Sequence, residues 1–247
     1  AGLGAGIGTG FAGMSAAAVI SPMLITFLGF PAYEAVGIAL ASDVLASAIS
    51  AYTYGKHKNL DVKNGIIMLI SVLVFTLVGS FVASKVPNRS MGSFSVVMTF
   101  LLGIKFLVKP VMTTKETQAD KDTRTKIIQS LLCGALIGFI CGFIGAGGGM
   151  MMLLILTSVL GYELKTAVGT SVFIMAFTAF TGAVSHFTIG GIPDIPALLL
   201  CILFTLIGAR LAARFANKAS AKTLNRATGG VLTLLGLVMI VMNFLPA

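Results

Sequence analysis

The chain has 247 residues, of which 57% are hydrophobic and only 10% are charged, and its mean hydropathy is +1.01. This composition leaves too little polar surface to cover a globule in water, so it excludes a water-soluble protein and predicts an integral membrane protein. A net charge of +9 is also typical of nucleic-acid-binding proteins, but the basic residues lie between apolar segments, where the positive-inside bias accounts for them. We therefore expect the lipid bilayer as a partner and exclude nucleic acid.

Eight apolar blocks follow one another along the chain. They cover residues 2–28, 35–54, 64–84, 90–108, 127–160, 166–189, 195–213 and 227–245. Each is near the roughly 20 residues that a bilayer-spanning helix requires, so the sequence predicts an all-α integral membrane protein. Cys133, Cys141 and Cys201 fall inside these blocks without the spacing of a metal site, and we expect no disulfide, no metal and no cofactor.

The chain contains two copies of one unit. Residues 6–18 align with 138–150, and residues 28–37 align with 160–169, at a constant offset of 132 positions. Of the 46 ungapped pairs in the aligned region, eleven are identical and five of these are glycines, which indicates a shared backbone requirement. We assign residues 1–109 to the first repeat, 110–126 to a cytoplasmic linker and 127–247 to the second repeat.

The basic residues decide between two topologies. Eight simple crossings would divide the 17 Lys and Arg residues 9 to 8 between the two sides of the membrane. If blocks 2–28 and 127–160 each enter and leave on the same side, three crossings remain per repeat and the division becomes 15 to 2, as the positive-inside rule predicts. This topology places the linker 109–126 in the cytoplasm and both termini outside, and it inverts the second repeat relative to the first. Kinked full spans remain the alternative for the two blocks.

The middle of each of these two blocks predicts a break in the helix. Gly145, Gly147, Gly148 and Gly149 would each cost about 1 kcal/mol in a regular helix, whereas the first repeat carries Met14 and the small residues 15–18 in the matching region. Two half-helices that start near the midplane present free N–H groups and positive dipole ends, so we predict a small anionic substrate. Nearby hydroxyl groups either contact this anion or bond to their own helix backbone, and both interpretations stay open. They belong to Ser15, Ser21, Ser42, Thr157, Thr170 and Ser171.

Asp43 is the costliest residue in the sequence, because a charge in the middle of a spanning segment costs roughly 3 kcal/mol on insertion scales. Met175 stands at the matching position of the second repeat. We consider Asp43 a candidate proton carrier coupled to anion movement, with a structural hydrogen bond to a neighbouring Ser or Thr, or an interfacial position, as the alternatives. His186 is a second candidate for proton coupling, with a hydrogen-bonded interfacial histidine as its alternative.

Several motifs occur together in both repeats. The second repeat contains GFIGAGGGM at 142–150, LGYELKTAVGTS at 160–171 and SHFTIGGIPD at 185–194. The first repeat contains the weaker versions GFAGMSAAA, LGFPAYEAVGIA and YGKHKNLD. In combination, and over nearly the whole chain, these motifs resemble the sulfite exporter TauE/SafE family of membrane permeases.

The resemblance implies a permease for small sulfur-containing anions, such as sulfite or organosulfonates, that works in export or in uptake. The first repeat departs from the family pattern at residues 14–18, where the glycine cluster is replaced, and at Ile38 and Ala39, where the Thr and Ser hydroxyls of the second repeat are lost. Carried over position by position, the substrate-binding residues that the resemblance implies are Ser15, Gly145, Gly147, Gly148, Gly149, Thr170 and Ser171.

We therefore expect a multi-pass transporter of the cell membrane made of two inverted repeats, each with a broken or re-entrant helical segment and three transmembrane helices. The anion would bind near the midplane between the two broken segments. A passive anion channel and a non-transporting scaffold or sensor are the alternatives, and a homo-oligomer is left open. An enzyme is not expected, because no His/Cys/Glu or Ser/His/Asp group converges in the sequence.

Overall fold

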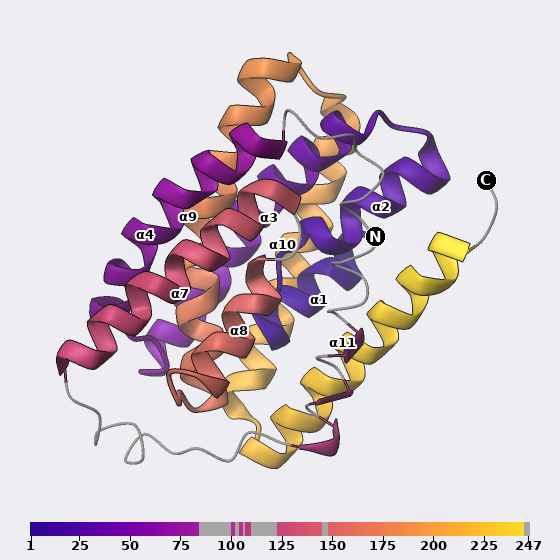
Figure 1. The fold of residues 1–247 in the computed structure, drawn as a ribbon. Helices are drawn as coiled ribbons and strands as arrows, with labels where there is room; N and C mark the ends of the chain where they lie inside the picture. Colours follow the sequence, from indigo (N-terminus) through magenta and orange to yellow (C-terminus); the bar gives the residue numbers. More distant parts are fainter. Residues whose placement is uncertain (84–99, 102–103, 106, 110–122, 145–147, 245–247) are drawn as a thin grey trace.

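The computed structural model describes residues 1–83, 100–101, 104–105, 107–109, 123–144 and 148–244, and these contain helices and no strand. Four of the described helices are long and apolar enough to cross a membrane. The prediction of an all-α membrane protein is confirmed. The helices are α1 (Gly2–Ala12), α2 (Ala17–Leu28), α3 (Ala32–Lys56), α4 (Val62–Ala83), α7 (Thr123–Ile144), α8 (Gly148–Ser158), α9 (Leu164–Gly190), α10 (Ile195–Lys218) and α11 (Ala221–Phe244) (Figure 1).

The two blocks that were expected to be broken each give two helices. Block 2–28 divides into α1 and α2, and block 127–160 divides into α7 and α8. Residues 145–147, between the second pair, lie outside the described residues, as does most of block 90–108. Residues 110–122 of the predicted linker also lie outside them, and α7 begins at Thr123, within that linker.

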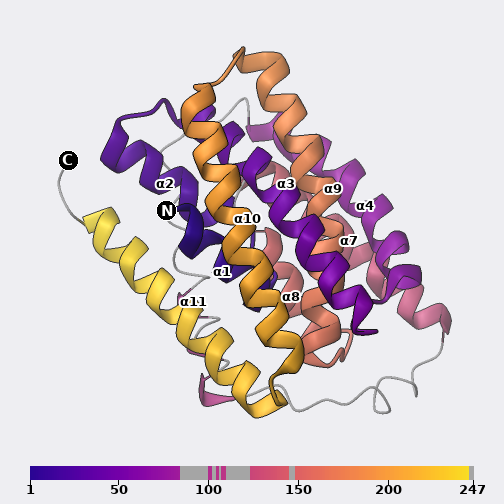
Figure 2. The same ribbon diagram turned by 180° about the vertical axis from the view of Figure 1, so that it is seen from behind.

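Helices α3 and α9 pack side by side in opposite directions at the centre of the bundle (Figures 1 and 2). The contact is close because both helices place a glycine in it. Gly37 of α3 lies against His186 of α9, and Gly169 of α9 lies against Tyr54 of α3. Gly37 and Gly169 are 132 positions apart, as are Tyr54 and His186, so the two repeats use matching positions for this interface.

Helix α1 packs against α10, and α7 packs against α4. A Cβ atom added to Gly6 would overlap the carbonyl oxygen of Thr205, and one added to Gly138 would overlap the carbonyl oxygen of Val72. Gly6 and Gly138 are also 132 positions apart. Small residues allow helices inside a membrane to approach closely, and here each broken segment uses them to contact a helix of the other repeat.

The first broken segment turns back on itself. Gly2 lies against Phe204 and Gly10 against Ala213, so α1 runs in the same direction as α10. Helix α2 then returns to the end of the bundle where α3 and α10 begin (Figure 1). At that end the Asp194 N–H donates a hydrogen bond to Glu34 Oε1 (2.8 Å). The segment is therefore a hairpin and not a kinked full span.

The second broken segment approaches from the other end. Helix α7 begins beside the start of α4, and α8 leads back to the end at which α3 finishes and α9 begins (Figures 1 and 2). Glycines with left-handed backbone close both return paths, since Gly29 after α2 has φ +67° and Gly161 after α8 has φ +74°. These two glycines are again 132 positions apart. That the two repeats are inverted across a membrane stays a prediction.

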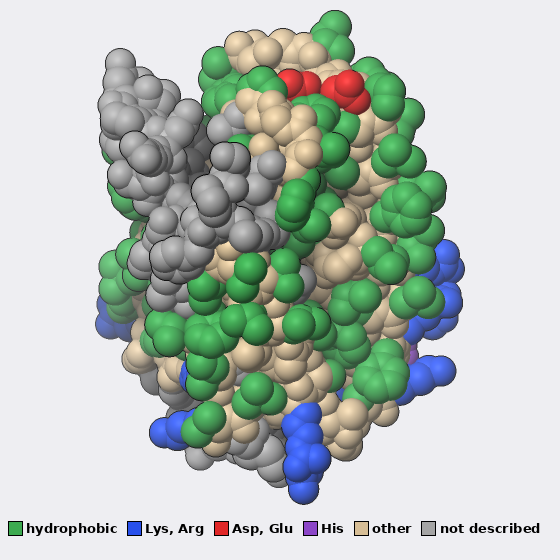
Figure 3. Space-filling view, turned by 90° about the vertical axis from the view of Figure 1, so that its right-hand side faces the viewer, with side chains coloured by type: hydrophobic (Ala, Val, Ile, Leu, Met, Phe, Trp, Pro, Cys, Tyr) green, Lys and Arg blue, Asp and Glu red, His purple; other side chains and the backbone are tan. Residues whose placement is uncertain are grey.

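Charged side chains are distributed unevenly along the bundle. On the face drawn in Figure 3, Lys and Arg side chains lie at and below mid-height, whereas Asp and Glu side chains lie near the top. The lower end in Figure 1 is where α3 and α10 finish with Lys56 and Lys218 and where α9 begins beside Lys165. The basic residues of the described chain therefore gather toward one end, which is the arrangement that the positive-inside argument needs.

Candidate functional site at the junction of the two broken segments

The first break is a short non-helical stretch between α1 and α2. Gly13 has φ +62°, a left-handed conformation that ends α1, and its N–H donates to the carbonyl oxygen of Thr9 (2.9 Å). Residues 13–16 are not helical, and α2 begins at Ala17. Ser15 is fully buried in this stretch, and its hydroxyl accepts a hydrogen bond from the Ala17 N–H (3.3 Å).

Hydroxyl groups from three other helices hold the end of α1. The last carbonyl groups of a helix have no partner within it, so they must find donors elsewhere when they are buried. The donors are Tyr54 Oη to Gly10 O (2.8 Å), Thr228 Oγ1 to Phe11 O (3.1 Å) and Ser171 Oγ to Gly13 O (2.9 Å). Helices α3, α11 and α9 thereby fix the first break from three directions.

The start of α8 lies directly against this break. A Cβ atom added to Gly149 would come within 2.6 Å of the Ser15 nitrogen and 2.7 Å of the Gly13 oxygen, so only glycine permits the approach. Ser171 Oγ lies 2.9 Å from the Gly13 oxygen and 3.5 Å from the Gly149 oxygen. The structure thus brings Ser15, Ser171 and Gly149 to one junction between the two broken segments.

The remaining predicted glycines flank this junction in the sequence. Gly145 and Gly147 lie outside the described residues, and Gly148 is the first residue of α8, next to Gly149. The binding role of these glycines stays a prediction.

Thr170 faces a different part of the molecule from its neighbour Ser171. Its Oγ1 accepts a hydrogen bond from the Asp61 N–H (3.2 Å), which lies just before α4. Successive residues of a helix point about 100° apart, so adjacent hydroxyls on α9 reach different surroundings. The structure does not bring the Thr170 hydroxyl to the junction.

Asp43 lies in the middle of α3 and is fully buried. The Ser47 hydroxyl donates to Asp43 Oδ1 (2.9 Å), which is the hydrogen bond to a neighbouring serine that the sequence left as an alternative. The Ser15 side chain and the Ala16 backbone N–H also face this carboxylate from the first break. The structure therefore places Asp43 beside the junction.

His186 lies near the end of α9, away from Asp43 along the bundle. Its ring stacks on that of Tyr33, with centroids 4.2 Å apart, and its Nδ1 is 3.1 Å from the Tyr33 carbonyl oxygen. This environment corresponds to the hydrogen-bonded histidine that was the alternative to proton coupling.

Sequence reasoning missed two residues that hold the junction, Tyr54 and Thr228. Tyr54 opens the YGKHKNLD motif and Thr228 lies in none of the motifs, and the sequence does not reveal which backbone carbonyl a hydroxyl in an apolar helix will reach. Two of the other hydroxyl candidates bond locally, since Ser42 donates to Ile38 O and Thr157 to Leu153 O on their own helices, whereas the buried Ser21 hydroxyl makes no hydrogen bond to any described residue. For those two residues the local interpretation is confirmed.

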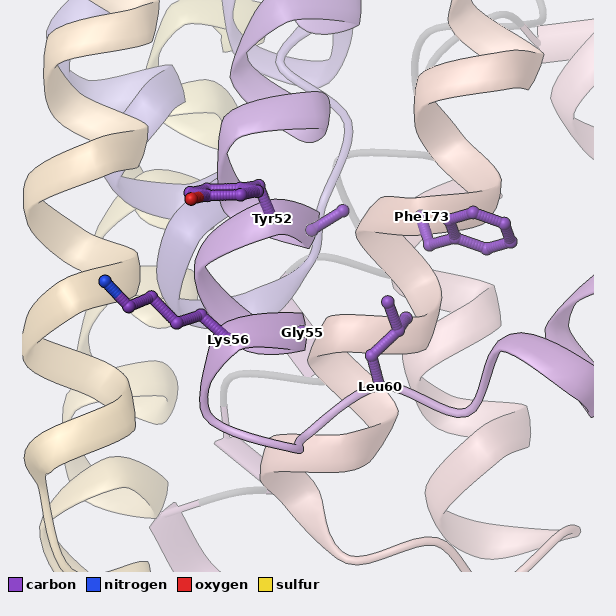
Figure 4. Close-up of a pocket in the computed structure, with 6 residues that line it drawn as sticks. Tyr52, Gly55, Lys56, Leu60 and Phe173 are labelled. Carbon is purple, nitrogen blue, oxygen red and sulfur yellow. The ribbon is translucent and has the colours of Figure 1, made fainter.

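An open groove of about 560 Å³ lies near the end of α3, on the surface of the bundle (Figure 4). Tyr52 and Lys56 point outward from α3 to the same side, and Phe173 of α9 points away from them. The groove contains none of the residues predicted to bind substrate. Its lining residues are Ala51, Tyr52, Gly55, Lys56, Leu60 and Phe173.

Two helical hairpins that meet inside a bundle of apolar helices define a multi-pass membrane protein. Many membrane transporters bind their substrates between broken helices of this kind. The family model described as sulfite exporter TauE/SafE matches residues 1–239, and the chain belongs to this family. The predicted resemblance is confirmed. The protein is therefore a membrane transporter and not a member of an enzyme class.

Curated relatives carry the same general description. A probable membrane transporter protein from Methanocaldococcus jannaschii is 28% identical, with 95% of this chain and 88% of the relative covered. Two probable membrane transporter proteins from Bacillus subtilis, YdhB and YunE, are 26% and 27% identical. The match covers 86% of both chains for YdhB, and 95% of this chain and 90% of the relative for YunE. No solved structure matches the chain.

Proposed function

We propose that this transporter moves small sulfur-containing anions, such as sulfite or organosulfonates, across the cell membrane. The anion binds near the midplane, at the junction of the two broken segments, and is exposed alternately to each side. The family description, sulfite exporter, supports this class of substrate. Sulfite and sulfonates share an anionic group with three oxygen atoms, which several N–H and O–H donors can bind at once.

The observation that carries the proposal is the contact between the start of α8 and the first break. Gly149 is the second residue of the 11-residue helix α8, so the N–H groups of the first turn of α8 and its positive dipole end lie at the junction. Ser171 adds a hydroxyl that lies near both breaks. An anion that displaces the close contact at Gly149 would gain these donors.

The same close contact favours a transporter over a passive channel. A channel needs a continuous wet path, whereas Gly149 is buried against Gly13 and Ser15. We therefore infer that the described arrangement is one in which the junction is closed, and that transport requires the two hairpins to move apart.

The orientation follows from charge. We propose that the end of the bundle that carries Lys56, Lys165 and Lys218 faces the cytoplasm, together with the linker 109–126, and that both termini lie outside. The matching contacts of Gly6 and Gly138, and of Gly37 and Gly169, support an inverted relation between the repeats.

Ligand-dependent stability of the detergent-purified protein tests the proposal. We expect sulfite, thiosulfate or sulfoacetate to raise the melting temperature, because a ligand at 100 times its Kd stabilises the folded state by about 2.7 kcal/mol. Acetate and chloride are the sulfur-free controls, and sulfate tests whether the site distinguishes among sulfur oxyanions. Equal responses to all six anions, or no response to any, would contradict a site for sulfur-containing anions. A selective anion would then be followed into liposomes to measure its transport.

A further inference from the structure

Asp43 carries a buried oxygen atom without a partner at the junction. Its Oδ1 accepts a hydrogen bond from Ser47, but no donor among the described residues reaches hydrogen-bonding geometry at Oδ2, although the side chain is fully buried and the Ser15 hydroxyl and Ala16 N–H lie near the carboxylate. A buried carboxylate oxygen that lacks a donor is costly while the group is charged. A proton on Oδ2 removes this cost and turns the atom into a donor.

No positive side chain compensates the Asp43 charge within the described part of the chain. The groups that face the carboxylate are Ser47 on its own helix, Ser15 and the Ala16 N–H on the first break, and the Cys141 thiol on α7. Its immediate surroundings are thus three neutral side chains and the positive end of α2.

The two half-helix starts at the junction therefore differ. At the start of α2 the Ala17 N–H is already bonded to Ser15, and Asp43 supplies a carboxylate. At the start of α8 the position that matches Ala17 is Gly149, and the position that matches Asp43 is Met175. A substrate anion at the start of α8 would thus lie across the junction from the Asp43 carboxylate, and two buried negative charges disfavour each other.

We propose that Asp43 takes up one proton each time the anion binds, so that the transporter carries one proton with each anion. This inference rests on the proposed anion site. The proton comes from water on the side to which the junction is open and binds Oδ2, and it leaves to water on the other side when the anion leaves. Protonation removes the repulsion between Asp43 and the anion, so binding of either favours binding of the other.

Calorimetric titration of the purified protein as a function of pH tests this inference. The probes are thiosulfate and sulfoacetate, whose own charges stay constant between about pH 6 and pH 8. For the wild type we expect the Kd to rise with pH, by up to about tenfold per unit, because one proton binds with each anion. Asp43→Asn, which keeps a neutral polar side chain, should bind the anion with a Kd that does not change with pH.

The controls separate this inference from the site itself. Glu34→Gln neutralises a carboxylate at the far end of α3 and should keep the pH dependence of the wild type. A wild-type Kd that is the same at all pH values, or an Asp43→Asn variant with the wild-type pH dependence, would overturn the role of Asp43 while leaving the anion site intact. If neither probe binds to the wild type or to Asp43→Asn at any pH, the proposed site is wrong and this inference falls with it.

A second variant keeps the inference testable if Asp43→Asn does not fold. Ser47→Ala removes the donor that stabilises the charged carboxylate, so the protonated form should persist to higher pH. We therefore expect the pH at which anion affinity begins to fall to be higher in this variant than in the wild type. An unmoved pH dependence would contradict the role of Asp43, because a purely structural hydrogen bond would change the stability and leave the pH dependence of the Kd unaffected.

Discussion

The two breaks meet the same requirement with different residues. The first break carries a single glycine, Gly13, and three hydroxyls from other helices donate to its carbonyl and to two carbonyls near the end of α1. The second break has a glycine-rich sequence, and Gly149 at the start of α8 fits against the backbone of the first. The first break is therefore held by side chains of other helices and lies beside the carboxylate of Asp43, whereas the second break provides the close backbone approach that the proposed anion site needs.

The largest effect is expected at Gly149. Replacing Gly149 with Leu places a large side chain where even a Cβ atom would lie 2.6 Å from the Ser15 nitrogen. We expect anion affinity to fall at least roughly tenfold, because overpacking costs about 1–3 kcal/mol and the first break would be displaced. The measurement is anion-dependent thermal stabilisation. Gly230→Leu is the control, since an added Cβ meets nothing within 4 Å there, and equal affinity in the two variants would contradict the site.

Alanine at Gly6 and at Gly138 tests whether the two repeats pack alike. In each case the new Cβ meets a backbone oxygen of a helix from the other repeat, which cannot move without the helix. We expect each substitution to lower the free energy of unfolding by about 1–3 kcal/mol, and by similar amounts. Unfolding in denaturant measures both. If one variant is as stable as the wild type, the two interfaces are not equivalent.

Ser171→Ala should weaken the connection between the breaks. The change leaves the buried Gly13 carbonyl without its donor, which costs about 1–3 kcal/mol, and it removes a hydroxyl from the proposed anion site. Thr178→Ala on the same helix is the matched control, because its hydroxyl donates only to Ile174 of α9 itself. Melting temperature and anion Kd should both change for Ser171→Ala and stay near wild-type values for the control. The reverse pattern would remove Ser171 from the site.

Tyr54→Phe removes the hydroxyl that donates to Gly10 at the end of α1. We expect a loss of about 1 kcal/mol in unfolding free energy, the usual net contribution of such a hydrogen bond. Tyr52 lies two residues away on α3 with 69% of its surface exposed, so Tyr52→Phe should have almost no effect. Thermal unfolding of both variants distinguishes the buried hydroxyl from the exposed one, and equal stabilities would show that the first break does not depend on Tyr54.

The smallest effect is expected at Thr170. Thr170→Val has nearly the same shape, and it removes only the acceptor for the Asp61 N–H at the start of α4. We expect a cost of about 0.5–1.5 kcal/mol in stability and an unchanged anion Kd. A clear loss of affinity in calorimetric titration would show that Thr170 reaches the anion in another state of the transporter.

Much of the fold could be predicted from the sequence, because membrane helices and close glycine contacts both leave strong patterns. The 132-residue offset identified Gly6, Gly138, Gly37 and Gly169 as shared positions, and the structure gives each of them a close helix contact. The sequence could not predict which helix each glycine contacts, since that choice depends on how the two repeats are arranged in space.

The site was less accessible to sequence reasoning. Thr170 and Ser171 are adjacent and chemically alike, yet only the Ser171 hydroxyl reaches the first break. Their difference arises from the rotation of α9 about its own axis. The sequence does not reveal this rotation, because α9 is apolar on all its faces. Tyr54 and Thr228 were missed for the same reason, because their partners are backbone carbonyls that any helix offers.

The most direct test of the central claim is an experimental structure of the protein with sulfoacetate bound. If the anion binds between the two broken segments, its density should lie at the start of α8, in contact with Gly149 and Ser171, with Asp43 across the junction. Density for the anion elsewhere, for example beside Lys56 in the open groove at the end of α3, with the junction closed and unoccupied, would contradict it.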